Sequence, residues 1–238
     1  MSDLKKTIGI IGGMGPMATA DLFYQIINLT KSDNDSGHIH ILIDNNTKIP
    51  DRTTAILNGD DTPLKCLINS ANGLKNMGAD FLIIPCNTSH YFYDRLCSAV
   101  DIPVINMIEE TAKAVKENGI KKAGLFATVG TVKTGVYKDM FSRYGIEIIT
   151  PDDNWQKAVT DMIYKTVKAG KKPEFTEITK TAKDLFDKGA KTIILGCTEL
   201  PIAFEGYKFP YNLINPTEIL AKSAIKFAGY EVKTVPIK

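Results

Sequence analysis

The chain has 238 residues, 44% of them hydrophobic, so it is long enough to bury a sizeable core in one large domain or two small ones. Its formal net charge is only +2, from 29 basic and 27 acidic residues, so neither nucleic acid nor a membrane surface is expected as a partner. No apolar run approaches the roughly 18 residues of a membrane span, and residues 1–7 are too polar for a signal peptide, so we expect a cytoplasmic protein.

Apolar runs of strand length alternate with segments of helical periodicity from one end of the chain to the other. Continuous apolar runs, without alternation, are typical of strands buried on both faces of a parallel sheet. Strands that alternate with helices imply right-handed crossover connections. We therefore predict an α/β fold with eight strands, at residues 7–12, 39–44, 80–85, 103–105, 123–127, 147–149, 192–196 and 211–214.

A glycine-rich segment, GGMGP at residues 12–16, follows the first predicted strand and opens a helix. Exposed N–H groups at such a helix start can bind an anion. The segment also matches a permissive form of the dinucleotide-binding fingerprint. However, the acid that ends the second strand, Asp44, lies 29 residues after Gly15, where that pattern requires about 20. We therefore do not expect a nicotinamide or flavin cofactor.

Arg52 lies in a polar loop after the second predicted strand. Its guanidinium could clamp a carboxylate with two parallel hydrogen bonds. A surface salt bridge with Asp51 explains the same pattern equally well. Thr128 and Thr131 follow the predicted strand at 123–127 and could supply hydroxyl and N–H donors to a ligand.

Cys86 and Cys197 occupy the same position in two copies of one pattern, 111 residues apart. In each copy a glycine, Gly78 or Gly189, precedes an apolar run that ends at the thiol. Residues that favour helix starts follow each thiol, and a helix N-terminus lowers a thiol pKa from about 8.5 toward neutrality. A single such cysteine is usually a buried structural residue. Packing gives no reason for a matched pair, so we predict that these two thiols act as acid and base.

The repeat includes a second pair of segments, because residues 104–109 match residues 213–218 at a spacing of 109. We therefore predict two halves related by a pseudo-twofold axis, each a four-stranded parallel sheet flanked by helices. The N-terminal half is expected to comprise residues 1–106 with 216–238, and the C-terminal half residues 107–215. Because ligands of doubly wound sheets bind outside the carboxyl ends of the strands, the site is expected in the cleft between the halves.

The other cysteines, Cys66 and Cys97, lie in helix-like segments and are expected in the core. Four cysteines in so long a chain without a secretory signal indicate free thiols. Cys86 and His90 have helical spacing, but two ligands do not make a zinc site, so no metal is expected. His90 is expected either to support Cys86 or to pack on its own helix.

These segments together resemble the aspartate/glutamate racemase family, and within it the aspartate racemases that work without a cofactor. The resemblance covers nearly the whole chain and rests on five motifs: IGGMGP at 11–16, PDR at 50–52, PCNTSH at 85–90, ATVGT at 127–131 and GCTEL at 196–200. It implies two Rossmann-like halves with the active site between them, Cys86 and Cys197 as the acid/base pair, no cofactor, and a homodimer. It also implies that the last helix packs back on the first half.

The resemblance further implies that an acidic amino acid is the substrate. Its α-carboxylate is expected to lie against Asn87, Thr88 and Ser89, and its side-chain carboxylate near Arg52 and Lys165. The full set of substrate-binding residues that we predict is Met14, Arg52, Thr53, Asn87, Thr88, Ser89, Thr128, Lys165, Thr198 and Glu199.

We therefore predict an isomerase that interconverts L- and D-aspartate by two-base proton transfer at Cα. Without pyridoxal phosphate no electron sink delocalises the carbanion, so hydrogen-bond donors must stabilise the developing charge. Glu199 is expected to favour the protonated thiol of Cys197 by like-charge repulsion. The alternatives are a related racemase that acts on glutamate, on many amino acids or on a carbon acid such as maleate, and a non-catalytic protein that binds an acidic ligand.

Overall fold

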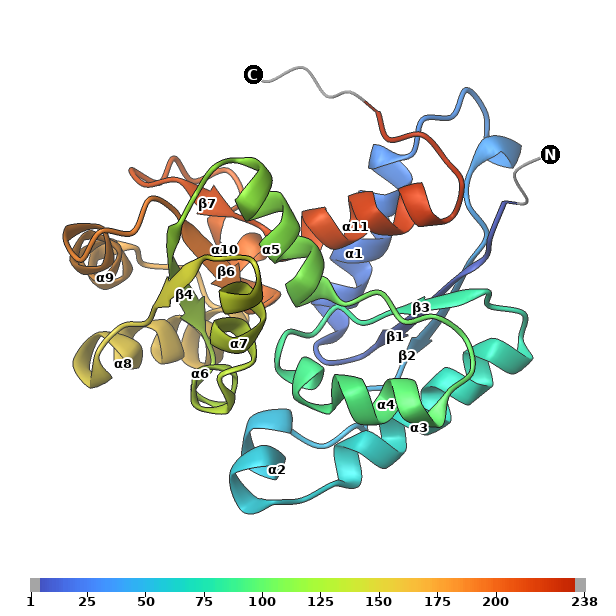
Figure 1. Ribbon diagram of the computed structural model, residues 1–238, viewed down its shortest axis with the longest axis horizontal. Helices are drawn as coiled ribbons and strands as arrows, with labels where there is room; N and C mark the ends of the chain where they lie inside the picture. The colour runs from blue at the N-terminus through green and yellow to red at the C-terminus, as the bar shows by residue number, and fades with distance from the viewer. Residues whose placement is uncertain (1–4, 234–238) are drawn as a thin grey trace.

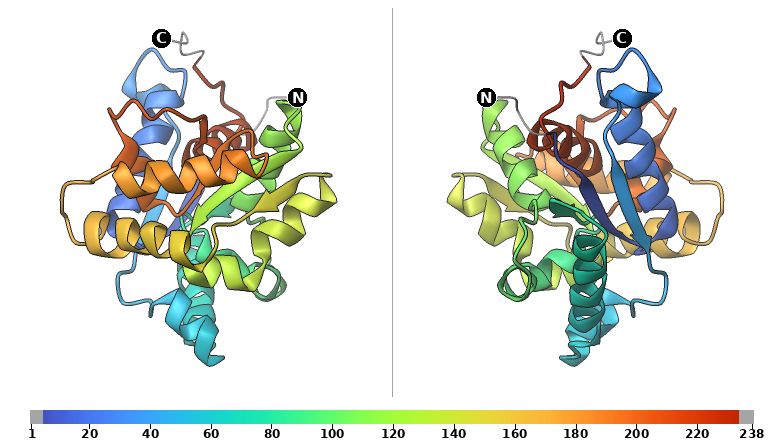
Figure 2. Two further views of the ribbon diagram at one scale, coloured as in Figure 1. Left: turned by 90° about the vertical axis from the view of Figure 1, so that its left-hand side faces the viewer. Right: turned by 90° about the vertical axis from the view of Figure 1, so that its right-hand side faces the viewer.

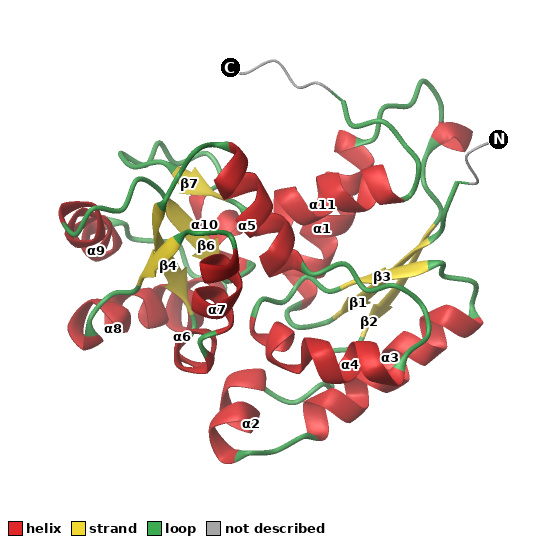
Figure 3. Cartoon of the chain, viewed as in Figure 1, coloured by secondary structure: helices red, strands yellow, loops and turns green. Residues whose placement is uncertain are grey.

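Two parallel β-sheets, one in each half of the chain, organise the computed structural model, which describes residues 5–233 (Figures 1 and 3). This confirms the predicted α/β class. The first sheet has the order β2-β1-β3, formed by β1 (Ile8–Gly12), β2 (Ile41–Asn45) and β3 (Phe81–Ile83). The second has the order β5-β4-β6-β7, formed by β4 (Lys122–Ala127), β5 (Glu147–Ile149), β6 (Ile193–Gly196) and β7 (Leu213–Ile214).

The strand predicted at residues 103–105 is the one exception. Only Val104 pairs there, in an isolated parallel bridge with Leu82. Leu82 exchanges backbone hydrogen bonds of 2.8 and 2.9 Å with Pro103 and Ile105. Proline has no N–H to donate, and β3 is only three residues long, so the pairing does not extend into a strand. The first sheet therefore has three strands instead of the predicted four.

Helices cover both faces of the first sheet, and the alternation of side chains along β1 explains why. Ile8 and Ile10 point into a core formed with α1 (Pro16–Leu29) and α11 (Pro216–Phe227). Ile11 points into the opposite core. That second core includes residues of α3 (Thr62–Asn76) and α4 (Tyr93–Ala99). The shorter elements of this half are η1 (Asp35–Gly37), α2 (Arg52–Asn58) and the 3-10 helix η2 (Thr88–Phe92).

The second sheet is covered in the same way. One face packs against α8 (Asp153–Asp161), the π-helix η3 (Met162–Val167), α9 (Thr176–Asp187) and α10 (Glu199–Phe204). The other face packs against α5 (Met107–Glu117) and α7 (Val136–Arg143), with α6 (Val129–Thr134) between β4 and α7. Burial on both faces accounts for the continuous apolar character of β4 and β6.

The last helix packs back on the first half. Leu220, Ala221 and Ala224 of α11 belong to the core that contains β1 and α1. Figures 1 and 2 show α11 beside α1, although some 190 residues separate them in sequence. The domain boundaries at residues 106 and 216 remain a prediction. Within residues 5–233, no helix is long and apolar enough to cross a membrane.

The sequence repeat corresponds to repeated local structure. Gly78 and Gly189 both have positive φ, +102° and +101°, which glycine adopts without steric cost. Asn106 and Asn215 both cap the helix that follows, each accepting hydrogen bonds from the second and third backbone N–H groups of that helix at 2.9–3.3 Å. Equivalent residues of the two halves therefore have the same backbone conformation or the same capping role.

Candidate active site

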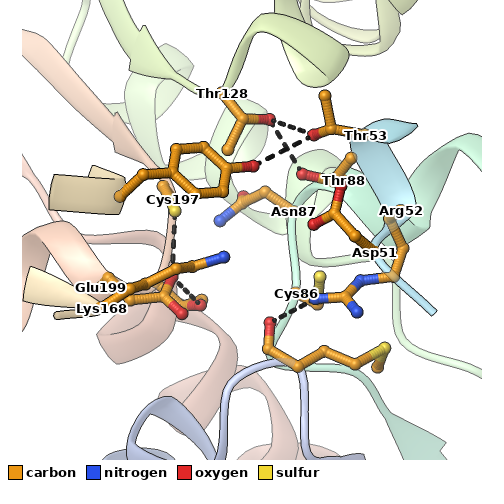
Figure 4. A pocket seen from close by; sticks show the side chains of 13 residues that line it. Asp51, Arg52, Thr53, Cys86, Asn87, Thr88, Thr128, Lys168, Cys197 and Glu199 are labelled. Atoms are coloured by element: carbon orange, nitrogen blue, oxygen red, sulfur yellow. Dashed lines mark hydrogen bonds between the residues drawn. The ribbon is translucent and has the colours of Figure 1, made fainter. Parts of the chain in front are cut away.

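A narrow pocket lies between the halves, at the carboxyl ends of the strands where the sequence predicts the site. It measures about 280 Å³ including its open mouth. The loops after β1, β2 and β3 line it from the first half, and the loops after β4 and β6 line it from the second (Figure 4). Its lining residues are Met14, Asp51, Arg52, Thr53, Cys86, Asn87, Thr88, Thr128, Tyr164, Lys168, Cys197, Thr198 and Glu199.

Cys86 and Cys197, the two cysteines matched by the repeat, both line this pocket. Cys86 follows β3 after a two-residue extension, and Cys197 follows β6 directly. Both are free and equally buried, with 5% and 6% of their surface exposed. Cys66 and Cys97 are only partly buried and do not line the pocket. One thiol from each half therefore reaches the same small space.

The Cys197 thiol is held by Glu199. Its Sγ donates to Glu199 Oε2 at 3.0 Å, and this carboxylate is only 5% exposed. Burial, reinforced by the negative charge of Glu199, raises the pKa of Cys197 well above its usual range. The prediction that a helix N-terminus lowers this pKa is wrong for Cys197, because burial and the Glu199 charge in the first turn of α10 both raise it. The raised pKa agrees in direction with the prediction that Glu199 favours the protonated thiol of Cys197.

The loop that carries Cys86 is held by His90. The His90 Nε2 accepts a 3.1 Å hydrogen bond from the backbone N–H of Met107, so the ring proton lies on Nδ1, which donates to the Cys86 carbonyl at 2.9 Å. Burial lowers the pKa of His90 to about 4, so the ring is neutral. His90 therefore links the first thiol to the start of α5.

Arg52 lines the pocket and forms no ion pair with an acidic side chain of residues 5–233. Its two terminal nitrogens donate to three backbone carbonyls, one of them that of Met14, at 2.9–3.2 Å. Its Nε is buried and has no hydrogen-bond partner among the described residues. Asp51 instead caps α2 by accepting from the Thr54 N–H at 2.8 Å, so the surface salt bridge with Asp51 is wrong. A buried cation without a counterion favours an anionic ligand here.

Asn87 presents a second set of unused donors. Its Oδ1 accepts a 2.6 Å hydrogen bond from the Tyr137 hydroxyl. Its Nδ2 is buried and has no partner within the described part of the chain. Because the side chain is committed to Tyr137, it does not cap η2 as its residue type predicts. The amide N–H groups remain free for a carboxylate.

Threonine hydroxyls connect the two halves across the pocket. Thr88 Oγ1 lies 3.1 Å from Thr128 Oγ1 and 2.9 Å from Thr131 Oγ1. Thr53 donates to Thr128 Oγ1 at 3.4 Å. On the other side, the Thr198 hydroxyl donates to the Pro85 carbonyl at 3.3 Å. These contacts position Thr53, Thr88 and Thr198 at the pocket as predicted.

Lys168, rather than Lys165, supplies the lysine of the pocket. The Lys165 side chain is 69% exposed and pairs with Asp161 at 2.8 Å, outside the pocket. Lys168 lines the pocket; burial opposes its charge, but the charges of Glu199 and Cys197 outweigh burial and raise the pKa of Lys168. The cause of the misprediction is the π-helix, in which the Lys168 N–H donates to the carbonyl five residues earlier. This wide turn rotates Lys168 away from Lys165.

Ser89 is the other predicted residue that the structure does not bring to the pocket. It is 1% exposed, and its hydroxyl contacts the Met14 sulfur at 3.3 Å. In the 3-10 helix η2, successive side chains point in different directions, so Thr88 faces the pocket and Ser89 does not. Conversely, Asp51 and Tyr164 line the pocket without having been predicted. Asp51 belongs to the PDR motif at 50–52, which could have indicated it, whereas no local sequence signal distinguishes Tyr164.

Comparison with known proteins agrees with this arrangement. A model of the family "Asp/Glu/Hydantoin racemase" matches residues 11–224. The chain is 28% identical over 222 residues to the broad specificity amino-acid racemase RacX of Bacillus subtilis, covering 92% of this chain and 96% of that protein. The structure of Picrophilus torridus aspartate racemase is 29% identical, with a TM-score of 0.81 and coverage of 96% of both chains. Glutamate racemase of Aquifex aeolicus is 30% identical over 169 residues, 68% of this chain and 63% of that protein. The chain belongs to the Asp/Glu/hydantoin racemase family.

Proposed function

We propose that the protein is a cofactor-independent racemase that interconverts L- and D-aspartate, with Cys86 and Cys197 as the two bases. The observation that supports this most directly is the meeting of one thiol from each half in a single pocket. A racemase must remove a proton from one face of Cα and return one to the opposite face. Two bases carried by opposing halves suit that task.

The free donors of the pocket suit the two carboxylates of the substrate. Arg52 and Lys168 provide positive charge for the side-chain carboxylate. The Asn87 amide, with the hydroxyl of Thr88, provides donors for the α-carboxylate. As the Cα–H bond breaks, its electron pair moves into that α-carboxylate, which becomes enediolate-like. Donors already in place there stabilise the charge as it develops.

The experiment that tests the proposal is racemisation of L- and D-aspartate in deuterated water, with deuterium at Cα measured by mass spectrometry. Cys86→Ala and Cys197→Ala should each lower racemisation by at least about a thousandfold, because a positioned acid or base contributes up to about 10⁴-fold. Cys66→Ala is the matched control and should retain full activity, since that thiol lies outside the pocket. Full turnover by either pocket variant would reject the two-base assignment.

A broader substrate range is the second candidate, because RacX matches nearly the whole chain. Racemisation assays on a panel of free amino acids distinguish aspartate specificity from a broader substrate range. Aspartate specificity predicts that Arg52 and Lys168 favour an acidic side chain, so the kcat/KM for aspartate should exceed that for alanine or leucine by at least about tenfold. Similar values across the panel would favour broad specificity, and a maximum with glutamate would favour glutamate racemisation. Binding of aspartate without deuterium uptake would indicate a non-catalytic binding protein.

We also propose that the protein works as a cytoplasmic homodimer, as its resemblance to the family implies. Sedimentation velocity should give a particle of twice the mass of the chain at working concentrations. A single species of monomer mass would contradict this.

A further inference from the structure

We infer that the resting site is asymmetric: Cys197 holds the proton, retained by Glu199, and Cys86 is the thiolate that removes the first substrate hydrogen. This inference rests on the proposed two-base function and deepens it by assigning a starting role to each thiol. Glu199 acts through Cys197 and is therefore a positioning residue.

The Glu199 carboxylate is fixed against Cys197. Its Oε2 accepts from the Cys197 Sγ at 3.0 Å and lies 3.4 Å from the Thr198 hydroxyl oxygen. Its Oε1 faces the glycine turn, where an added Cβ on Gly15 would lie 3.1 Å away. An ionised carboxylate can only accept hydrogen bonds. The short sulfur–oxygen contact therefore requires a proton between the two atoms, and a thiolate there would face a like charge.

The first half lacks this carboxylate. Moving back by the repeat spacing of 111 residues, the position equivalent to Glu199 is Thr88, a neutral hydroxyl. The backbone carbonyl of Cys86 accepts a hydrogen bond from the neutral ring of His90. Within residues 5–233 no carboxylate forms a hydrogen bond with the Cys86 thiol, whereas the Cys197 thiol has one with Glu199. Both halves therefore carry a thiol at the equivalent position. Two residues later the second half has a carboxylate, Glu199, and the first half has a neutral hydroxyl, Thr88.

The other titratable groups that face Cys197 do not remove the asymmetry. Lys168 interacts with both thiols and more strongly with Cys197, whose pKa it lowers, but burial and the Glu199 charge outweigh this effect, so the pKa of Cys197 is still raised. The phenols of Tyr137 and Tyr164 also face Cys197, and burial raises the pKa of each, so both remain neutral near pH 7. Glu199 is thus the charged group that distinguishes the two thiols.

The assignment fixes the proton balance of a turnover. The Cys86 thiolate takes the Cα proton as the C–H electron pair moves into the α-carboxylate, and the Cys197 thiol then gives its proton to the other face. The enzyme is left with a Cys86 thiol and a Cys197 thiolate, and exchange with solvent restores the resting form. Because the two enantiomers are equally stable, kcat/KM must be equal in both directions. A difference between the two directions of racemisation can therefore appear only in kcat and KM values that differ by the same factor.

Alkylation tests the assignment without substrate, because only a thiolate reacts rapidly. Iodoacetamide labelling from pH 6 to 10, quantified by peptide mass spectrometry, should modify Cys86 several-fold faster than Cys197, because the Glu199 carboxylate disfavours the Cys197 thiolate. Equal burial of the two thiols makes this a comparison of charge state instead of access. Equal labelling, or faster labelling of Cys197, would overturn the assignment.

Glu199→Gln keeps the shape of the side chain and removes its charge. It should accelerate Cys197 labelling and narrow the ratio several-fold, whereas the matched control Glu205→Gln, at the exposed end of α10, should leave the ratio unchanged. An unchanged ratio in Glu199→Gln would refute the role of Glu199. A second measurement needs neither substrate nor that variant: ultraviolet titration should reveal thiolate at lower pH in Cys197→Ser, which keeps Cys86, than in Cys86→Ser. The reverse order would also refute the assignment.

The racemase function and the charge asymmetry of the two thiols can be refuted independently of each other. A protein that shows the predicted labelling but no deuterium exchange would refute the racemase function and retain the charge asymmetry. A protein that racemises aspartate but labels both thiols equally would refute only the asymmetry.

Discussion

The hydroxyl of Tyr137 in α7 donates a 2.6 Å hydrogen bond to Oδ1 of Asn87, the residue that follows Cys86. Both side chains are buried, and they belong to different halves of the chain. The bond fixes which end of the Asn87 amide faces the pocket, and leaves Nδ2 as the free donor. A core residue of the second half thus orients a pocket residue of the first.

Tyr137→Phe should therefore damage both stability and activity. It leaves the Asn87 oxygen buried without a donor, which costs about 1–3 kcal/mol in the free energy of unfolding measured with urea. It also frees the amide to rotate, so kcat/KM for aspartate should fall at least about tenfold. Tyr144→Phe is the control, because that hydroxyl bonds to Glu109 away from the pocket. Equal losses of activity in both variants would contradict the orienting role.

Lys168→Met should raise the KM for aspartate by about tenfold or more, since a hydrogen bond to a charged group contributes about 1.5–3 kcal/mol. Lys165→Met removes the same charge three residues earlier and should change KM little, because exposed ion pairs such as Lys165–Asp161 contribute at most about 1 kcal/mol. Steady-state kinetics of the two variants, side by side, make the comparison. The opposite order of effects would show that the pocket lysine is Lys165 after all.

Arg52→Lys retains the positive charge but cannot reproduce the three bonds to backbone carbonyls. We expect a lower melting temperature and a rise in KM of at least about tenfold. Arg95→Lys makes the same substitution in an exposed pair with Asp61, and should leave the melting temperature and the kinetics close to those of the wild type. Wild-type kinetics in Arg52→Lys would mean that charge alone is required at this position.

His90 should make the protein less stable in mild acid. In the folded chain burial lowers the pKa of His90 to about 4, whereas in the unfolded chain it is about 6.5. Between these values the unfolded state binds a proton that the folded state does not. The stabilisation from neutral His90 is therefore complete above pH 6.5 and is lost as the pH falls toward 4, amounting in total to about 3 kcal/mol.

Urea unfolding at pH 7 and pH 5 measures this effect. The wild type should lose about 2 kcal/mol from this source between the two conditions. His90→Asn should lack that part of the pH dependence, and His40→Asn, which alters an exposed histidine, should retain it. An identical pH dependence in the wild type and in His90→Asn would contradict the assignment of a neutral buried ring.

The fold and the presence of Cys86 and Cys197 in one pocket can be predicted from the sequence because they depend on periodic burial and on a repeat. β4 and β6 are apolar throughout since both faces are covered, and Cys86 and Cys197 stand out because nothing in packing demands two matched thiols. Features that depend on a single local contact are not accessible in this way. The raised pKa of Cys197 follows from its burial and from the Glu199 carboxylate 3.0 Å away, and the place of Ser89 follows from the pitch of a five-residue 3-10 helix.

The π-helix between α8 and the loop at residue 168 has a consequence for comparing members of this family. In an ordinary α-helix a step of three residues would leave Lys168 only about 60° around the axis from Lys165, on the same side. The widened turn separates them, so that one lysine reaches the pocket and its neighbour faces solvent. An alignment that slips by one turn over this stretch would pair a pocket residue with a surface residue. The number of residues in this segment, as much as their types, therefore determines which side chain can contact a bound molecule.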